Sequence, residues 1–350
     1  MDKNIICICL FTAFFSCTPN KEAPSCLLQS FLPQKSQESS IDDPFFGNMK
    51  HIYLETNDSC LIGRVNKIVK SNGNYYILSD DRNIDMFDDD GSFISRLNKL
   101  GGGPGEYADI GDFNIVDIYD ESEIWICDFD KIKRYKLNPA NRVWNFISDL
   151  SFDIMINKFA VINKNSLLLM TGREEKSLTV VDINTNNVEK TFLDKEIPFL
   201  TFKSVQFTPC DSLFLFPLGQ ANGLVAYSPI NGEFRKMTYF EDQNFLSEKE
   251  LLDLFREYEY DFLGKISNHT YIRHIAISGD RMILDTFSDG YRIFYFTDDN
   301  INWKYIKCNV GNDIEPNPLL TVGMSISSDS FIMFDYNHKA DQENPYLIEF

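Results

Sequence analysis

The sequence is poor in the residues from which most metal-dependent and nucleophilic active sites are built. Only 4 histidines occur among 350 residues, and they form no zinc-hydrolase motif. A Gly-x-Ser-x-Gly sequence, which marks the nucleophile of many hydrolases, is absent. These absences exclude the hydrolase classes that leave a linear motif. They do not exclude an enzyme whose ligands come from several separate segments.

Cysteine is too scattered to build a disulfide scaffold. Of the 8 cysteines, Cys7 and Cys9 lie in the apolar amino terminus and Cys17 follows it. No Cys-x-x-Cys pair occurs among the rest, so a dense disulfide framework and a structural zinc site are both excluded. We expect most of the remaining five to be unpaired, with a bridge between the first two as an alternative: Cys26, Cys60, Cys127, Cys210 and Cys308.

Basic residues are also in short supply. The chain has 33 Lys and Arg against 52 Asp and Glu, which gives a formal net charge of −19. An acidic surface repels phosphate backbones. We therefore expect no nucleic-acid partner.

The amino terminus carries the features of an export signal. Asp2 and Lys3 precede an apolar run of 11 residues over 5–15, which ends at Ser16 and Cys17. A membrane-spanning helix needs about 20 apolar residues. A signal-peptide core needs roughly 7 to 15 followed by a small residue. The pattern predicts a signal peptide over residues 1–16 and an exported protein.

The end of this signal resembles the lipobox of bacterial lipoproteins, through the sequence Phe14-Phe15-Ser16-Cys17. The resemblance implies that Cys17 becomes the new amino terminus and carries the lipid that anchors the chain to a membrane. It also implies a location in the envelope of a Gram-negative bacterium, at the outer membrane or cell surface. Phe14 stands where leucine is usual, and a cleaved, soluble protein is the alternative. Residues 17–45, rich in Ser and Pro, are expected to form a polar tether.

One pattern recurs six times in the rest of the chain: a short polar turn followed by an apolar strand. The strands are 49, 43, 46, 69 and 49 residues apart, measured between their first residues. A four-stranded propeller blade occupies about 40 to 50 residues. The repeat therefore predicts six blades, whose apolar strands begin at Tyr75, Ile124, Leu167, Leu213, Met282 and Phe331.

The chain ends before the sixth repeat is complete. Five repeats have a second turn rich in Asn, Asp, Gly or Pro, but the sixth stops after the strand at 345–350. A spare strand at 50–55 precedes the first repeat, and an unpaired outer edge would be prone to aggregate. We therefore expect an all-β, six-bladed propeller of four-stranded antiparallel blades over 46–350. Its ring is closed by pairing of the amino-terminal strand with the carboxy-terminal blade.

The longest interval indicates a helical insertion at about 245–265, between blades 4 and 5. Ser247 and Glu250 form a capping box. After it, apolar residues recur three and four positions apart, opposite a polar face. The helix either packs on the ring as an accessory or serves as a lid or partner-docking element.

A glycine-rich segment follows the first repeat and resembles the Gly-x-Gly-Pro-Gly-Glu-(Phe/Tyr) signature of bacterial six-bladed propeller lipoproteins, which are similar to NHL-repeat propellers. The resemblance covers residues 46–350 through repeat number, this segment and the lipobox. It implies binding at the cell surface and supplies no catalytic residue. A phosphate cradle is excluded, because no Lys-Ser/Thr or helix follows. We expect the segment to shape a blade-to-blade crossover: Gly101, Gly102, Gly103, Pro104, Gly105, Glu106 and Tyr107.

Propeller topology places the blade-to-blade loops on one face, and here these loops are long. Charged residues occur where the inner strands begin, and could orient a polar ligand at the mouth of the pore. The alternative is that such strand-end charges are merely solvated. We predict a concave pocket on this face, with the inserted helix packed beside it. Its candidate residues are Arg64, Glu106, Tyr107, Asp112, Lys203 and Arg273.

Two functions remain open. The first is a non-catalytic binding or scaffold propeller of the cell envelope, whose ligand is an unidentified protein, glycan or small molecule. The alternative is a calcium-dependent pore enzyme of the lactonase or lyase type, in which calcium would be the only cofactor. The aspartates at 88–90 are turn formers by their position at a hairpin tip, so we assign no metal ligand and no catalytic residue.

Overall fold

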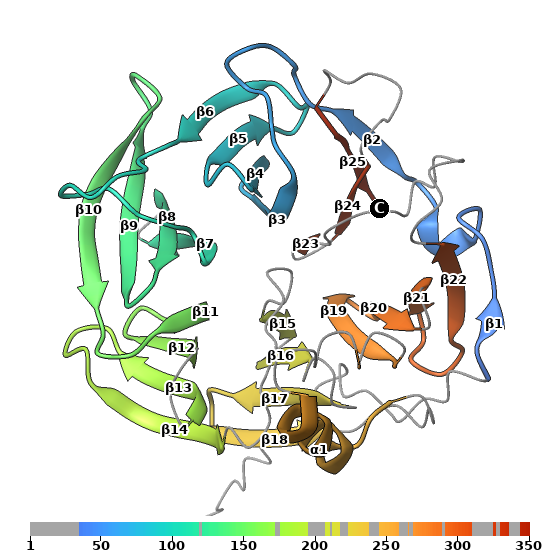
Figure 1. Cartoon of the computed structure of the whole chain (residues 1–350). Coiled ribbons are helices and arrows are strands. Elements are labelled where there is room, and N and C mark those ends of the chain that lie inside the picture. Colours follow the sequence, from blue (N-terminus) through green and yellow to red (C-terminus); the bar gives the residue numbers. More distant parts are fainter. Residues whose placement is uncertain are drawn as a thin grey trace, which may run out of the picture.

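The strands of the computed structural model form a ring of six sheets around a central axis (Figure 1). The structure describes residues 35–118, 121–171, 176–194, 207–210, 212–217, 223–237, 245–258, 265, 269–288, 291–309, 325–326, 330–335 and 344–350. Within these residues every blade has four antiparallel strands. The six-bladed, all-β propeller is therefore confirmed.

The first three blades follow the order of the sequence from the pore outward. Blade 1 contains β3 (Val65–Ser71), β4 (Asn74–Ser79), β5 (Ile84–Asp88) and β6 (Phe93–Leu97). Blade 2 contains β7 (Asp112–Ile118), β8 (Glu121–Asp128), β9 (Lys131–Asn138) and β10 (Val143–Ser151). Blade 3 contains β11 (Ile156–Asn163), β12 (Ser166–Thr171), β13 (Lys176–Asp182) and β14 (Val188–Asp194).

The other three blades complete the ring. Blade 4 contains β15 (Thr208–Cys210), β16 (Leu213–Pro217), β17 (Leu224–Ser228) and β18 (Glu233–Met237). Blade 5 contains β19 (Tyr271–Ser278), β20 (Arg281–Ser288), β21 (Tyr291–Thr297) and β22 (Lys304–Asn309). Blade 6 contains β23 (Ser325–Ile326), β24 (Phe331–Asp335), β25 (Tyr346–Glu349) and β2 (Lys50–Tyr53).

The recurrent turns connect the innermost strand of each blade to the second strand. In blade 1, Asn72 and Gly73 occupy this turn with φ of 49° and 70°. A two-residue hairpin turn with both residues at positive φ matches the twist of the flanking strands, and Asn and Gly tolerate it best. The second strand that follows is buried from Tyr75 to Ser79. The turn and the apolar run together set the register of the blade.

The ring closes as the sequence predicts. Strand β2 pairs with β25 in antiparallel register, with Ile52 opposite Leu347. Asn344, just before β25, donates its amide to the carbonyls of Glu55 (2.7 Å) and Cys60 (2.8 Å). Its amide oxygen accepts the N–H of Ile62. The two ends of the chain are therefore tied together by a ladder and by a buried side chain.

The hydrophobic core is divided among the blade interfaces. Six apolar clusters are found in the described part of the chain, and each joins two neighbouring blades. Between blades 2 and 3, for example, Trp125 packs in the same cluster as Phe159 and Leu167. Each blade therefore depends on its two neighbours for burial of its faces, which gives the ring its stiffness.

The segment before β2 lies against the outside of blades 5 and 6. Strand β1 (Gln37–Glu38) adds to β22 in parallel, so blade 5 has a fifth strand. A short helix, η2 (Pro44–Phe46), buries Phe45 and Phe46 in the cluster between the two blades. Asp43 forms an ion pair with Lys304 at 2.8 Å. Residues 35–45, which the sequence assigns to the tether, thus contact the ring in this structure.

The inserted helix, α1 (Glu248–Tyr258), lies next to β17 and β18 (Figure 1). Its capping box is present: the N–H of Glu250 donates to Oγ of Ser247, and Oε2 of Glu250 accepts the N–H of Ser247. Leu251 is fully buried in the cluster between blades 3 and 4, and Leu254 packs against the same cluster. Among the described residues, no helix has the length and apolarity needed to cross a membrane.

The cysteines depart in part from expectation. Cys60 and Cys127 are free and buried. The alternative bridge between Cys26 and Cys60 is therefore wrong, because the Cys60 thiol is enclosed and donates to the carbonyl of Glu55 instead (3.1 Å). Cys210, at the end of β15, is disulfide-bonded.

Candidate functional site

One face of the ring carries the loops that connect each blade to the next. Successive strands of an antiparallel blade run in opposite directions, so these loops share a face with the turns between the second and third strands. The loop from β6 to β7 and the turn from β8 to β9 therefore lie on the same face. The candidate residues are expected on this face.

The glycine-rich segment forms the crossover from blade 1 to blade 2 and folds back on itself. The N–H of Gly103 donates to the Glu106 carboxylate at 2.7 Å, and the N–H of Glu106 donates to the carbonyl of Gly103 at 3.0 Å. A Cβ atom at Gly101 would lie 2.1 Å from the same carboxylate. A side chain at position 101 would therefore displace the Glu106 carboxylate from the Gly103 N–H, and Glu106 serves the loop that contains it.

Tyr107 lies in the core rather than on the surface. Its side chain is fully buried, and its hydroxyl donates to the carbonyl of Arg82 at 2.9 Å and accepts the N–H of Lys99 at 3.2 Å. Burial raises the pKa of Tyr107 to about 12. The hydroxyl of the neighbouring Tyr135 donates to the carbonyl of Gly105, whose φ is 74°. The segment is a structural crossover, and Tyr107 is its anchor.

Asp112 ties three blades together beside the pore. It is 1% exposed, and Oδ1 forms an ion pair at 2.8 Å with Lys67 of blade 1. Oδ2 accepts the N–H of Phe159 in blade 3 at 3.2 Å. The Lys67 ammonium also donates to the carbonyl of Phe113 at 2.6 Å. Asp112 is thus a buried structural carboxylate.

The other candidates are spread around the ring. Arg64 is exposed just before β3, and Arg273 is half-buried near the start of β19. Lys203 and Cys17 lie outside the described residues. The structure therefore does not gather the six candidates into one pocket within the part that it describes.

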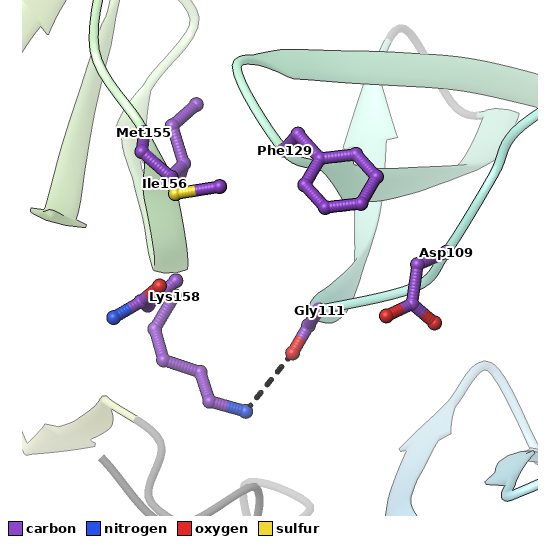
Figure 2. A pocket seen from close by; sticks show the side chains of 7 residues that line it. Asp109, Gly111, Phe129, Met155, Ile156 and Lys158 are labelled. Atoms are coloured by element: carbon purple, nitrogen blue, oxygen red, sulfur yellow. Dashed lines mark hydrogen bonds between the residues drawn. The ribbon is translucent and has the colours of Figure 1, made fainter. Parts of the chain in front are cut away.

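A pocket does open on this face, between blades 2 and 3. Its volume is about 200 Å³. Figure 2 shows the Phe129 ring on one side and Met155 with Ile156 on the other, while the polar ends of Asp109 and Lys158 lie below them. The lining comes from the end of the glycine-rich crossover, the turn after β8 and the start of β11: Asp109, Gly111, Phe129, Met155, Ile156, Asn157 and Lys158.

Phe129 holds an unusual backbone conformation at the rim. Its φ is 56°, a value that a bulky aromatic residue adopts at a cost of about 1 to 3 kcal/mol. The ring is nevertheless 49% exposed. The turn is held in place from blade 3, because the N–H of Ile156 donates to the carbonyl of Phe129 at 2.8 Å. A strained, exposed aromatic ring at a pocket rim points to a role outside folding.

The polar side of the pocket carries both signs of charge. Lys158 is 4% exposed, and its ammonium donates to the carbonyl of Gly111 at 3.1 Å. The Asp109 carboxylate makes no hydrogen bond or ion pair with any residue that the structure describes. The Asp109 backbone is fixed, since its N–H donates to the Asp128 carboxylate at 3.2 Å. A carboxylate that bonds to none of the described residues therefore stands near a buried ammonium group.

The free thiol beneath the pocket is not a nucleophile. Cys127 is fully buried, and its thiol donates to the carbonyl of Ile156 at 3.3 Å. Burial raises the pKa of the Cys127 thiol well above its usual value, and the charge of Asp112 adds to this effect. The reactive form of cysteine is the thiolate. The thiol therefore serves as a packing group.

Within the described residues, no three His, Cys, Asp or Glu side chains come close enough to hold a metal ion. The sequence reasoning did not single out the residues that line the pocket. Phe129 offered the one usable signal, because it stands in an Asp128-Phe129-Asp130 turn where Gly or Asn is more common. Asp109 lies in the crossover loop that was expected on this face.

Two solved structures share the architecture. A protein of Bacteroides fragilis described as exported superposes with a TM-score of 0.70 at 16% identity, covering 90% of this chain and 97% of its own. A member of the DUF4221 family from Bacteroides vulgatus gives a TM-score of 0.55 at 10% identity, covering 86% and 95%. At these identities the likeness is one of fold. The comparison with curated proteins finds no match.

The sequence itself also matches a family model. Residues 32–341 fit the model described as a domain of unknown function, DUF4934. The match begins before β1 and runs into blade 6, ending before β25, so it includes the segment that contacts blades 5 and 6 as well as the pocket. The chain therefore belongs to the DUF4934 family.

Proposed function

We propose that this chain is a non-catalytic binding propeller of the cell envelope, and that its ligand occupies the pocket between blades 2 and 3. The observation that carries this proposal is Phe129. A half-exposed aromatic ring is held at positive φ beside the Asp109 carboxylate, which bonds to none of the residues that the structure describes. Binding groups of this kind are kept at a cost to stability when they serve a ligand.

The surroundings of the pocket support a binding role. Its polar groups stand on a frame that is fixed by contacts between blades, including the ion pair of Lys67 with Asp112 and the hydrogen bond from Lys158 to Gly111. A site on a rigid frame pays little ordering cost when a ligand arrives. Loops on such a frame can vary without disturbing the blades.

Two observations support the proposed location in the cell envelope: the pattern of the amino terminus and the description of a structurally similar protein. The apolar run over 5–15 and Cys17 have the pattern of a lipoprotein signal. The similar protein of Bacteroides fragilis is described as exported. In the proposed arrangement Cys17 carries the lipid and residues up to about 34 connect it to the ring.

The anchor is tested by replacing its cysteine. Cys17→Ala should abolish incorporation of a labelled fatty acid and release the protein from the membrane fraction, because the thiol is the only proposed site of acylation. Cys26→Ala is the matched control and should remain labelled and membrane-bound. Unchanged labelling and fractionation of Cys17→Ala would disprove the anchor.

The binding role is tested by ligand-detected NMR on the full-length protein with a mixed library of sugars, amino acids, amines and small acids. At least one compound should receive saturation from the wild-type protein. The same compound should receive no saturation from Phe129→Gly. Glycine is chosen because it tolerates the positive φ at this position. If no compound distinguishes the two proteins, the pocket is not the binding site.

A further inference from the structure

We infer that the pocket takes a neutral sugar ring, an inference that rests on the proposed binding function. The pocket has two charges, an aromatic wall and a small volume. Each of these excludes a different class of small ligand.

The charges disfavour ions of either sign. A cation placed beside Asp109 and Phe129 would also approach the ammonium of Lys158, which is buried and cannot turn away into water. An anion placed beside Lys158 would meet the Asp109 carboxylate, on a chain of net charge −19. Like charges repel most strongly where one of them is buried, as the Lys158 ammonium is. A ligand with hydroxyl groups avoids both conflicts, since a hydroxyl can donate to Asp109 and accept from Lys158.

The wall of the pocket suits a ring with one apolar face. The Phe129 ring is open to solvent on the rim, with Met155 and Ile156 opposite it (Figure 2). A pyranose ring presents C–H groups on its face and hydroxyl groups on its edge. Stacked on Phe129, its edge would lie toward the polar side of the pocket. An extended aliphatic chain would cover the Asp109 carboxylate without giving it a hydrogen bond, at a cost in desolvation.

The size agrees with a single ring. The pocket volume of about 200 Å³ is smaller than the roughly 300 to 1,000 Å³ of sites for drug-sized ligands. A single sugar residue, free or at the end of a longer glycan that continues into solvent, is therefore the expected occupant.

The test uses three matched panels in saturation-transfer NMR with the full-length protein: methyl glycosides of common hexoses, free amino acids and primary alkylamines. At least one glycoside should bind, with the strongest transfer to the C–H protons of its ring. Phe129→Gly should raise the Kd of this glycoside by about tenfold, and Asp109→Ala should raise the Kd as well. Tyr53→Ala removes an exposed aromatic ring from blade 6 and should leave binding unchanged.

The outcomes separate this inference from the proposed function. If amino acids or amines bind in a Phe129-dependent manner and glycosides do not, the pocket is a binding site but the sugar assignment is wrong. If a glycoside binds equally to all variants, or if no panel shows Phe129-dependent binding, both the assignment and the site are overturned. Melting curves of Phe129→Gly distinguish lost contact from lost fold, because glycine relieves the strained φ.

Discussion

Asp112 is the residue on which three blades depend. Its carboxylate is buried and bonded to Lys67 of blade 1 and to the backbone of Phe159 in blade 3. Asp112→Asn keeps the size but leaves the Lys67 ammonium buried without its counter-charge. Breaking a buried pair in this way costs about 3 to 5 kcal/mol. We expect a loss of that order in the free energy of unfolding, measured by urea denaturation.

The control for this prediction is the neighbouring carboxylate of the pocket. Asp109 is partly exposed and has no partner among the described side chains. Asp109→Asn should therefore change stability by no more than about 0.5 kcal/mol. Equal effects of the two substitutions would show that the Lys67 pair contributes nothing specific to the ring.

His274 should make the ring sensitive to mild acid. Burial lowers its pKa to about 4, and the nearby charges of Lys67, Arg292 and Arg273 act in the same direction, while Asp285 opposes them. The unfolded chain binds this proton near pH 6.5. Between pH 6.5 and about 4 the unfolded state therefore holds more protons, so stability falls as the pH falls.

The corresponding experiment follows the melting temperature from pH 7 to pH 5 in the wild type and in His274→Gln. The variant should lose less stability over this range than the wild type. Carboxylates with a lowered pKa, such as Asp43 and Glu349, also stabilise the fold. Their contribution to stability is lost only as the pH falls below the ordinary carboxylate pKa near 4, outside the range of this experiment. Parallel curves for the two proteins would contradict the role of His274.

At the scale of elements, the segment before β2 behaves as part of the ring. Phe46 is 3% exposed and contacts the rings of Phe296 and Phe350 at centroid distances of 4.8 and 5.2 Å. Phe46→Ala should lower stability by about 3 to 5 kcal/mol, the usual cost of removing a buried aromatic ring. Ile301→Ala, at a position 73% exposed, should cost under about 0.5 kcal/mol. Thermal unfolding of both variants provides the comparison.

The blades could be predicted from the sequence because their signals are local. Asn72 and Gly73 specify a tight turn, and the apolar run from Tyr75 specifies the strand that follows. Strand β1 could not be predicted. Gln37 and Glu38 show no apolar alternation, and their pairing with β22 depends on a surface that forms only in the folded ring.

The candidate site was less accessible to sequence reasoning than the blades. Asp112 and Tyr107 have the residue types of a binding face, but packing against neighbouring blades buries both. The pocket depends instead on the positive φ of Phe129 and on the approach of two blades. Neither property is visible in local sequence, because both arise from contacts between residues far apart in the chain.

The whole molecule depends on closure of the ring by strand β2. Deletion of residues 50–55 removes β2 and the partner of Leu347 and Ile348. The exposed edge of β25 should lower the melting temperature and promote association of the protein. Differential scanning calorimetry and light scattering measure these two effects. An unchanged melting curve would show that the ring does not rely on this pairing.

Closure by strand β2 also determines the order in which the blades can be completed. Strand β2 is made long before Asn344, whose amide donates to the carbonyl of Glu55 across 289 positions. The strands of blades 1 to 5 all precede those of the carboxy-terminal part of blade 6. Blade 6 therefore cannot be completed until β25 has been made. A chain truncated before β25 is therefore an open arc with two unpaired ends, and such a truncation should be far more damaging than the number of residues removed suggests.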